Sequence, residues 1–446
     1  MAIGYFEPGK KIQLVHGGTA VVKGKPLGEG GQGVVYLVSI GNEEYALKWY
    51  HKTAIKDPDA FYKNLGNNIN KGKPNNSFLW PLYLTEREDG SFGYVMELRQ
   101  KNFIELSRFL VVKARFASIS AIINACLNIT SAFRDLHHKG YSYQDLNDSN
   151  FFFDPKTGDT LICDNDNVAP DRTNLGIAGK ARYMAPEVVR GEFKPDVDTD
   201  QFSLAVILFL ILFLNHPLEG QRVNDVDLLD DEEEKKLFGV EPIFIYDKDD
   251  TRNTPVRAVH VNVLRFWPLY PKLIKEQFMR AFSKEAMARA KDTTPPRLTD
   301  REWRTAFIQL RDMLVTCPCG GETFIPPDEE SSKCIHCGIK IPRPSVLKRG
   351  RYNVTLFPGK KLYKCHVDTN SDDYETVWGE VVRSPKNEQV WGLKNTSDTQ
   401  WLVTKTDGTE TEVAKGQVAI IVTTKAINFG TGTATSTGTA TINHQS

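Results

Sequence analysis

The sequence lacks an excess of charge of either sign. Its 446 residues include 56 Lys and Arg against 56 Asp and Glu, so the formal net charge at pH 7 is +0. A protein that binds nucleic acid or an anionic membrane through its overall field needs a basic excess, and here such binding would require a local patch. We therefore expect neither nucleic acid nor membrane among its partners.

The sequence also lacks a long hydrophobic run and a secretion signal. The longest apolar stretch, Phe202–Leu214, is shorter than the roughly 20 residues that a membrane-spanning helix needs. We expect it to form a buried helix. Residues 1–7 show neither the basic start nor the apolar stretch of a signal peptide. These absences predict a cytoplasmic protein.

Cysteine is scarce and unevenly spaced, which argues against a disulfide framework. Of the seven cysteines, four cluster within residues 317–337, while Cys126, Cys163 and Cys365 lie alone in apolar or strand-like surroundings. Cytosolic thiols stay reduced, so such a cluster favours metal binding over disulfides.

The pattern of elements predicts an α+β protein with a bilobal first part. Short apolar strands separated by Gly and Asn turns, such as Thr19–Val22, indicate an antiparallel sheet near the N-terminus. Helical periodicity follows and closes with a capping box at Thr299–Glu302, with Trp303, Phe307, Leu310 and Leu314 on one face. Short strands return after the linker Pro342–Ser345. The expected parts are a sheet lobe (10–100), a helical lobe (101–315), a small cysteine-rich ribbon (316–343) and an all-β sandwich-like domain (350–446).

Two stretches carry little information. The acidic run Asp225–Glu234 is expected to be a solvated loop. The Thr- and Gly-rich tail, Thr431–Thr441, is either an edge strand or disordered.

A glycine-rich segment, Leu27–Tyr36, is the first candidate for binding chemistry. It holds Gly28, Gly30 and Gly33 in G-x-G-x-x-G spacing, and glycines let backbone amides approach phosphates closely. A dinucleotide-binding fold would place a helix directly after the third glycine, but a strand follows here. Lys48 ends the next expected strand, within reach of α- and β-phosphates. Alone, it reads as a surface lysine.

A second constellation follows in order along the chain. Tyr143–Asn150 contains an Asp and, five residues on, an Asn; Leu161–Asp166 contains Asp164; and Tyr183–Glu187 ends in Ala-Pro-Glu. With these motifs, residues 10–315 resemble the eukaryotic-type protein kinase family. Asp200–Leu204 resembles the start of that family's buried anchoring helix, and His216–Gly220 resembles its usual exit. Arg297 stands where the family places the partner of the Ala-Pro-Glu glutamate.

The resemblance implies a role for each retained residue. Asp145 would accept the proton of a substrate hydroxyl, Asn150 and Asp164 would hold Mg²⁺ or Mn²⁺, and Lys48 would brace the phosphates of ATP. The remaining nucleotide-binding positions implied by the resemblance are Gly28, Gly30, Gly33 and Val35, with the backbone of Glu97 and Arg99 after the gatekeeper Met96.

One departure from the family concerns the partner of Lys48. No glutamate occurs between Glu44 and Glu86, so the carboxylate that the family supplies from its sheet-lobe helix is missing. Asn67 or Asn68 lies near the expected place. An amide there would orient Lys48 without neutralising it.

Other departures lie in the loops. Tyr143 and Gln144 replace the His-Arg pair of the catalytic loop, which removes the usual acceptor for a phosphorylated activation segment. Asn165 and Asp166 replace the Phe and Gly that follow the metal-binding Asp, so the apolar plug of that segment is absent.

A displaced cation is a further possibility. The family places a lysine two residues after the catalytic Asp and a threonine later in the activation segment, but these positions hold Asn147 and Lys180. Either Lys180 replaces the missing lysine beside Asp145, or it faces solvent and the site has lost a charge.

The cysteine cluster predicts a zinc site. Cys317 and Cys319 form one pair, and Cys334 and Cys337 form a second pair, each followed by glycine. Four thiolates make a closed site with a structural role, which stabilises a segment too short for its own core. His336 is expected to point outward.

The C-terminal part resembles forkhead-associated β-sandwiches at Val381–Asn387, Trp391–Ser397 and Ile427–Gly430, without their usual phosphothreonine-reading residues. We expect a degenerate recognition or docking module. The order of kinase, ribbon and β-domain, with Phe78–Pro81, resembles bacterial kinases associated with tellurite-resistance (TerY-type) triads. That resemblance implies a von Willebrand A-type protein and a metal-dependent protein phosphatase as partners.

Three functions are open at this point. The first is an active serine/threonine protein kinase that uses Mg-ATP on protein substrates. The second is a pseudokinase scaffold that binds nucleotide, and the third is a kinase-fold small-molecule phosphotransferase, which explains the complete Ala-Pro-Glu segment poorly. Retention of Lys48, Asp145, Asn150 and Asp164 favours activity, because a scaffold needs neither a base nor two metal ligands.

Overall fold

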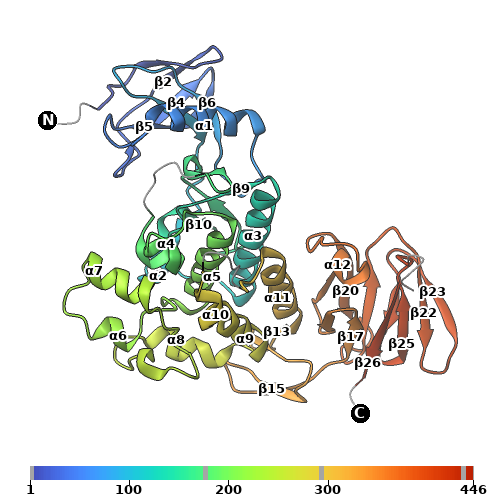
Figure 1. Cartoon of the computed structure of the whole chain (residues 1–446). Coiled ribbons are helices and arrows are strands. Elements are labelled where there is room, and N and C mark those ends of the chain that lie inside the picture. Colours follow the sequence, from blue (N-terminus) through green and yellow to red (C-terminus); the bar gives the residue numbers. More distant parts are fainter. Residues whose placement is uncertain (1–4, 174–178, 291–295, 433–437, 445–446) are drawn as a thin grey trace. The chain divides into compact units, whose positions relative to one another are not determined.

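The computed structural model describes residues 5–173, 179–290, 296–432 and 438–444. They form two compact units (Figure 1). The first runs up to Pro268 and includes Lys275–Arg304, and the second contains Leu269–Ile274 and the residues from Thr305 onward.

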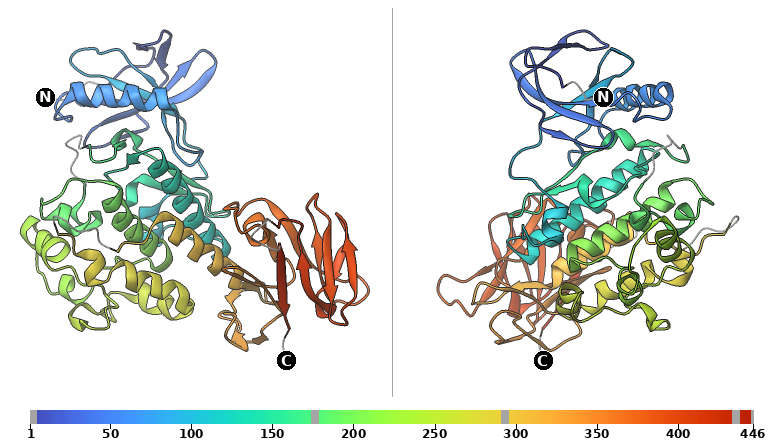
Figure 2. Two further views of the ribbon diagram at one scale, coloured as in Figure 1. Left: turned by 45° about the vertical axis from the view of Figure 1, so that its right-hand side comes forward. Right: turned by 90° about the vertical axis from the view of Figure 1, so that its left-hand side faces the viewer.

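The first unit begins with an antiparallel sheet (Figure 2). Its strand order is β1-β2-β4-β5-β7-β6, with β3 paired to β4. Alternation along β4 buries Val34, Tyr36 and Val38 in one apolar core, as the period of a strand requires. The expected antiparallel sheet is therefore confirmed. Its strands are β1 (Lys11–Gln13), β2 (Thr19–Val22), β3 (Gly28–Glu29), β4 (Gly33–Ile40), β5 (Glu43–Tyr50), β6 (Pro81–Leu84) and β7 (Gly93–Glu97).

One helix, α1 (Pro58–Lys71), packs beside this sheet (Figure 2). The Asp57 side chain accepts a hydrogen bond from the Ala60 N–H, and proline occupies the first helical turn, where its missing N–H costs nothing. The face that α1 buries carries Phe61 and Leu65 and also two asparagines, Asn64 and Asn68. Buried amides need hydrogen-bond partners, so this face does more than pack.

The remainder of the first unit is mainly helical around α5 (Val197–Phe213). Residues Thr199 to Phe213 of α5 are all buried, which confirms the expected buried helix. The capping box at Thr299 and Glu302 is also confirmed, since each side chain bonds the other residue's backbone N–H. The other α-helices that include residues of this unit are α2 (Leu106–Leu110), α3 (Ile119–His138), α4 (Pro186–Val189), α6 (Gln221–Asn224), α7 (Asp231–Glu234), α8 (Val261–Phe266), α9 (Lys272–Ala281), α10 (Lys284–Met287) and α11 (Asp300–Met313), of which α9 and α11 also include residues of the second unit. Short strands complete it: β8 (Ile104–Glu105), β9 (Tyr141–Ser142), β10 (Phe151–Phe153), β11 (Thr160–Ile162) and β12 (Ala169–Pro170).

Three details differ from expectation. The acidic run is partly helical, because Asp230 caps α7 by accepting from the N–H groups of Glu232 and Glu233. Leu314 belongs to a strand rather than to the helix that precedes it. The described part of the tail ends in β26 (Thr439–Asn443), which pairs on both sides and is therefore no edge strand; residues 433–437 lie outside the described chain.

The second unit contains two hairpins and a β-sandwich. The hairpins are β13 (Leu314–Thr316) with β14 (Glu322–Phe324), and β15 (Ser331–Lys333) with β16 (Lys340–Pro342). A six-stranded sheet, β18-β17-β26-β25-β22-β23, and a four-stranded sheet, β19-β20-β21-β24, share one core around the buried Trp401. The sandwich elements are β17 (Val346–Arg349), β18 (Tyr352–Thr355), β19 (Lys361–Tyr363), α12 (Lys364–Val367), β20 (Val377–Arg383), β21 (Trp391–Asn395), β22 (Trp401–Lys405), β23 (Glu410–Val413), β24 (Val418–Ile420), β25 (Thr424–Asn428) and β26.

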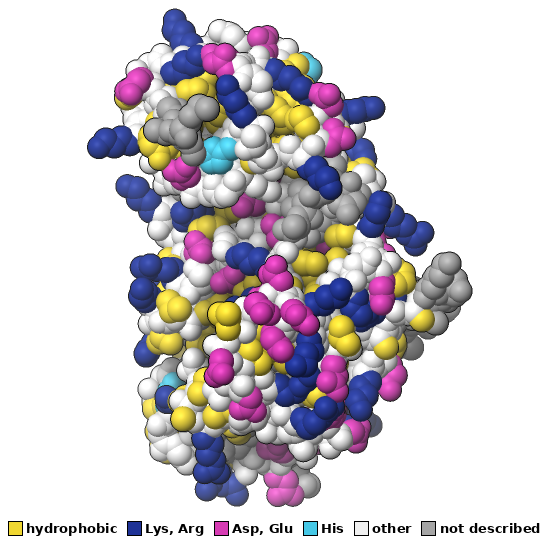
Figure 3. Space-filling model, turned by 60° about the vertical axis from the view of Figure 1, so that its left-hand side comes forward, with side chains coloured by type: hydrophobic (Ala, Val, Ile, Leu, Met, Phe, Trp, Pro, Cys, Tyr) yellow, Lys and Arg dark blue, Asp and Glu magenta, His cyan; other side chains and the backbone are white. Residues whose placement is uncertain are grey.

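The surface carries both signs of charge. On the face that Figure 3 shows, Lys and Arg side chains are interspersed with Asp and Glu side chains. Within the described chain, no helix combines the length and the apolar character that crossing a bilayer demands.

Candidate active site

The glycine-rich segment forms the hairpin of β3 and β4. Gly28 lies opposite Val35, and the Gly30 N–H donates to the Gly33 carbonyl over 2.9 Å. A Cβ on Gly33 would lie 2.2 Å from the Trp49 carbonyl oxygen, so only glycine fits there. A Cβ on Gly28 or Gly30 would meet no heavy atom within 4 Å, so packing does not explain these two glycines. An open backbone at this place is what close approach of phosphates requires.

Lys48 lies on β5 and is almost completely buried. Its Nζ is 2.8 Å from Asp166 Oδ2 and 3.2 Å from Asp164 Oδ1, and it donates to Gln32 of the glycine-rich hairpin over 3.2 Å. Burial lowers the pKa of Lys48, but the two carboxylates outweigh it and raise that pKa above its ordinary value. Lys48 is therefore a fixed cation inside the site.

The catalytic loop is anchored by α5. The Asp200 carboxylate accepts from the backbone N–H of Tyr143 over 2.6 Å and of Gln144 over 3.3 Å. Gln144 has a positive φ of 70°, a strained conformation that these bonds help to hold. The Tyr143 hydroxyl donates to the Cys163 carbonyl, which ties the loop to the segment that bears Asp164.

Asp145 lies within this loop, and each of its carboxylate oxygens accepts a hydrogen bond from an amide. Asn147 Nδ2 donates to one oxygen and Asn167 Nδ2 to the other, each over 3.2 Å. Burial raises the pKa of Asp145 to about 6; the Asn147 bond opposes this rise, and the charge of Asp164 adds to it. A carboxylate with a raised pKa accepts a proton more readily than an ordinary aspartate, which suits a general base.

Asp164 and Asn150 are the two residues that the sequence predicts as ligands of a divalent cation. Asp164 adopts the left-handed conformation (φ 52°), and its side chain is 45% exposed. Asn150 closes the short helix η1 (Asp148–Asn150), and its amide nitrogen donates to the Asp145 carbonyl over 2.8 Å, which leaves its amide oxygen available. Carboxylate and amide oxygens are the ligands that Mg²⁺ prefers, so this donor set fits the ion.

Lys180 reaches Asp145 through an intermediate. Its Nζ donates to Asn147 Oδ1 over 3.3 Å and to Ser149 Oγ over 3.4 Å, and Asn147 in turn donates to Asp145. The charge of Lys180 also lowers the pKa of Asp145, against the dominant effect of burial. The lysine therefore contacts the catalytic loop, with half of its side chain exposed.

The segment after β7 carries the other expected nucleotide positions. Met96 is buried in the sheet core, whereas Glu97 and Arg99 are exposed. The Arg99 guanidinium donates to the Phe103 carbonyl over 2.6 Å and lies 4.2 Å from the centre of the Phe152 ring. These contacts hold the side chain of Arg99 and leave the role of its backbone as a prediction.

The expectation for the partner of Lys48 is wrong. Asn68 does not orient Lys48, because its amide nitrogen donates to the Val168 carbonyl over 2.8 Å, and Asn67 is exposed. Asp166 takes that place, and the sequence reasoning missed it. The available signal was an extra acid two residues after the metal-binding Asp in a chain that lacks the helix glutamate.

The Ala-Pro-Glu segment is held by the expected arginine. Arg297 Nη1 and Nη2 lie 2.8 and 2.9 Å from the two oxygens of Glu187, and both side chains are buried. Such a two-point contact fixes orientation as well as distance. The predicted pairing of Arg297 with Glu187 is confirmed.

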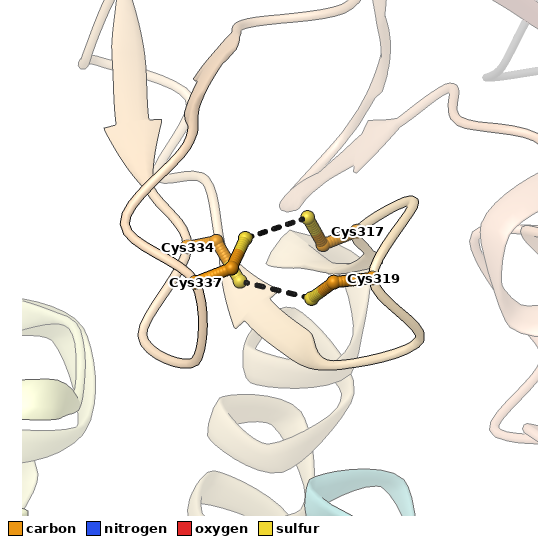
Figure 4. Close-up of side chains that lie close together, drawn as sticks. All are labelled: Cys317, Cys319, Cys334 and Cys337. Carbon is orange, nitrogen blue, oxygen red and sulfur yellow. Dashed lines mark hydrogen bonds between the residues drawn. The ribbon is translucent and has the colours of Figure 1, made fainter.

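The four clustered cysteines meet in space although they come from two hairpins (Figure 4). Cys317 Sγ lies 3.7 Å from Cys337 Sγ, and Cys319 Sγ lies 3.7 Å from Cys334 Sγ. A tetrahedral zinc with bonds of about 2.3 Å places neighbouring sulfurs about 3.8 Å apart, so the spacing fits the ion. Backbone N–H groups of Gly321 and His336 donate to two of the sulfurs. All seven cysteines lie within the described residues and are free thiols, and His336 is exposed.

Comparison with known proteins identifies the family. The family described as "Protein kinase domain" matches residues 21–279, which is more than half of the chain. The chain therefore belongs to the protein kinase family. A kinase domain implies ATP and Mg²⁺, which agrees with the donor set of Asn150 and Asp164.

Relatives show the same likeness over part of their length. "Protein kinase YegI" of Escherichia coli O157:H7 is 24% identical over 321 residues, or 67% of this chain and 46% of the relative. "Calcium-dependent protein kinase 9" of Arabidopsis thaliana is 28% identical over 200 residues, or 42% of this chain and 36% of the relative. The chain thus spans less than half of their lengths. The solved kinase domain of Mycobacterium tuberculosis PknI is 17% identical with a TM-score of 0.44, covering 69% of this chain and 100% of that domain.

Proposed function

We propose that this chain transfers the γ-phosphoryl group of Mg-ATP to serine or threonine hydroxyls of protein substrates. The observation that carries the proposal is the meeting of Lys48, Asp145, Asn150 and Asp164. Lys48 contacts Asp164, Asn150 contacts the loop of Asp145, and the charge of Asp164 acts on Asp145. Phosphoryl transfer depends mainly on positioning and electrostatics, which these four residues supply.

Each of these residues has a distinct role in the proposed reaction. Asp164 and Asn150 would hold magnesium, which would supply charge that stabilises the transferring phosphoryl group. Asp145 orients the substrate hydroxyl and accepts its proton, and Asn147 and Asn167 hold the carboxylate for that step. Lys48, which is hydrogen-bonded to Gln32 of the glycine-rich hairpin, binds the phosphates of ATP. Lys180, linked to Asp145 through Asn147, is proposed to replace the family's missing lysine.

The test of this proposal is incorporation of radiolabelled phosphate from ATP with Mg²⁺ or Mn²⁺, comparing wild type with Asp145→Ala. Mass spectrometry of the labelled protein should locate phosphate on Ser or Thr. Label on Tyr alone would overturn the assigned specificity. Nucleotide binding without any transfer in wild type would favour a pseudokinase scaffold instead.

We further propose that Cys317, Cys319, Cys334 and Cys337 hold one structural zinc ion. The support is that four sulfurs on two hairpins lie within 4.8 Å of one another and that the shared core of these hairpins is small. Four protein ligands leave no open position, so the ion stabilises the ribbon rather than taking part in catalysis. Metal analysis of the purified chain should give about one zinc per molecule.

The ribbon and the β-sandwich are proposed as docking modules for protein partners. The support is the separate compact unit that they form and the resemblance of the sandwich to forkhead-associated domains. A von Willebrand A-type protein and a metal-dependent protein phosphatase are the proposed partners, which rest on the resemblance to kinases of TerY-type triads. Binding of either purified protein to wild type, and loss of that binding on removal of residues 316–446, is the test.

A further inference from the structure

Two carboxylates contact Lys48, and they differ in their surroundings. The Asp164 side chain is 45% exposed, whereas the Asp166 side chain is fully buried and Lys48 is 7% exposed. A buried ammonium that lost its partner would carry a large desolvation cost, so a buried carboxylate at 2.8 Å is the contact that keeps Lys48 in place. Asp166 is therefore the constant partner, and Asp164 remains available for a cation.

The position of Asp166 follows from strand geometry. Lys48 and Tyr50 are two residues apart on β5 and point to the same side of the sheet. Both donate to the same oxygen, Asp166 Oδ2. Asp166 itself lies in the short helix η2 (Asn165–Asn167), which directly follows Asp164. One turn of chain thus supplies both the expected metal ligand and the partner of the phosphate-bracing lysine.

Helix α1 contributes contacts of another kind. Asn64 and Asn68 are one helical turn apart, and both donate to the Val168 carbonyl over 2.8 Å. Helix α1 is therefore hydrogen-bonded to the backbone of Val168, two residues after Asp166, and provides no carboxylate to Lys48. Its asparagines position the segment, and the segment positions the lysine.

The η2 segment is also fixed on its other side. Asn165, at the position of the family's apolar plug, donates to the Leu79 carbonyl over 2.7 Å and to the Ile162 carbonyl over 2.8 Å. Moving this segment out of place would break several buried hydrogen bonds and leave their polar groups unsatisfied. The arrangement is built to stay assembled.

We propose that Asp166 is the positioning residue for Lys48 in place of the family's helix glutamate, so that the nucleotide site is assembled without an inward movement of α1. This inference rests on the proposed function. It assigns the regulation of that site: an inhibitor or activator that works by displacing α1 would have to break the contact of Asn64 and Asn68 with Val168 rather than a lysine–glutamate pair.

A double-mutant cycle on the full chain tests this proposal, with Mg-ATP affinity measured by calorimetry. Asp166→Asn keeps the shape and an acceptor for Tyr50 but removes the charge. We expect it to weaken Mg-ATP binding about tenfold in wild type and less than about twofold in a Lys48→Met background, because the effect passes through Lys48. Equal losses in both backgrounds would show a merely structural role and would overturn the proposal.

Two further variants separate charge from packing. Tyr50→Phe removes the other hydrogen bond to Asp166 without changing charge, and it should weaken Mg-ATP binding less than Asp166→Asn does. Asp166→Gly restores the glycine that the family has at this position. Provided that thermal unfolding shows both variants folded, it should weaken Mg-ATP binding as much as Asp166→Asn does. Equal or larger loss in Tyr50→Phe would overturn the proposal. Nucleotide binding does not require phosphate transfer. If wild type transfers no phosphate but the cycle still shows coupling between Asp166 and Lys48, the proposed activity is refuted and this inference stands.

Discussion

Lys48 and Asp166 are 118 residues apart in the sequence and form a buried ion pair of 2.8 Å. In this kinase the charge that the helix glutamate supplies elsewhere in the family comes from the segment that also carries Asp164. The absence of the helix glutamate therefore does not indicate an inactive site, and we expect the chain to transfer phosphate.

The first prediction concerns the pH dependence of turnover. The pKa of Asp145 is raised to about 6, chiefly by burial, and only its carboxylate form accepts a proton. Since the base form is lost as pH falls through that pKa, kcat/KM should decline below about pH 6 and level off above it.

A variant distinguishes Asp145 from other groups that titrate near pH 6, such as ATP itself. Asn167→Ala removes the amide that donates to Asp145 Oδ2 and favours the charged form. The pKa of Asp145 should then rise, and the fall of kcat/KM in acid should begin at a higher pH. A limb that stays fixed in this variant would assign the titration to a group other than Asp145.

The second prediction tests Lys180. Its contact with Asn147 places it beside the catalytic loop, so Lys180→Ala should lower kcat about tenfold with a smaller change in the KM for ATP. Lys194, an exposed lysine of the same unit, provides the control, and Lys194→Ala should retain kcat within about twofold. Similar rates for both variants would mean that Lys180 is an ordinary surface lysine.

The third prediction compares two ion pairs of the first unit. Arg297→Ala removes the two-point contact with the buried Glu187 and leaves that carboxylate with Arg289 at 3.6 Å, which should lower the free energy of unfolding by about 2–3 kcal/mol. Arg280→Ala removes a partly exposed pair with Glu302 and should cost less than about 1 kcal/mol. Urea denaturation of both variants measures the difference. Equal costs would contradict the structural role assigned to Arg297.

The fourth prediction concerns His137, which lies between two aspartates. Its Nδ1 is 2.8 Å from Asp300 Oδ2, and its Nε2 is 3.2 Å from Asp200 Oδ2. Burial lowers the pKa of His137, but Asp300 and Asp200 outweigh it and raise that pKa to about 10, above the ordinary value of 6.5. The stabilisation of the folded state by charged His137 is therefore complete below about pH 6.5 and is lost as pH rises through about 10.

Thermal unfolding of wild type and His137→Gln from pH 6 to pH 10 measures how much the charge of His137 stabilises the protein. The melting temperature of wild type should exceed that of the variant by roughly 5 °C or more at pH 6, and the gap should narrow toward pH 10. A gap that is constant over this range would show that His137 acts through packing and not through its charge.

The fifth prediction concerns the cysteine cluster. Cys319→Ser should reduce bound zinc well below one per chain, whereas Cys365→Ala, a buried thiol of the same unit, should keep it. Chelation should unfold residues 316–343 and leave the first unit folded, because its core contains no metal ligand of this cluster. Hydrogen exchange measures both regions. Disulfides among the four sulfurs, or an ordered metal-free ribbon, would contradict the assignment.

The sequence predicted the parts of the site that depend on spacing along the chain. Asp145 and Asn150 share one loop, and Arg297 was paired with Glu187 through family position. The partner of Lys48 could not be predicted in this way, because Asp166 reaches it only through the fold of β5 against η2. The expectation that Asn67 or Asn68 orients Lys48 is wrong because the position of a residue on a helix does not reveal which backbone carbonyl lies opposite its side chain.

The most direct test of the proposed activity is a single-turnover measurement of phosphate transfer from radiolabelled Mg-ATP, with wild type and Asp145→Asn at pH 7.5. The account predicts transfer by wild type and a rate at least about a hundredfold lower in the variant, equivalent to about 2.7 kcal/mol in the barrier. Both proteins should bind nucleotide. Equal rates, or no transfer by a wild type that binds Mg-ATP, would contradict the account.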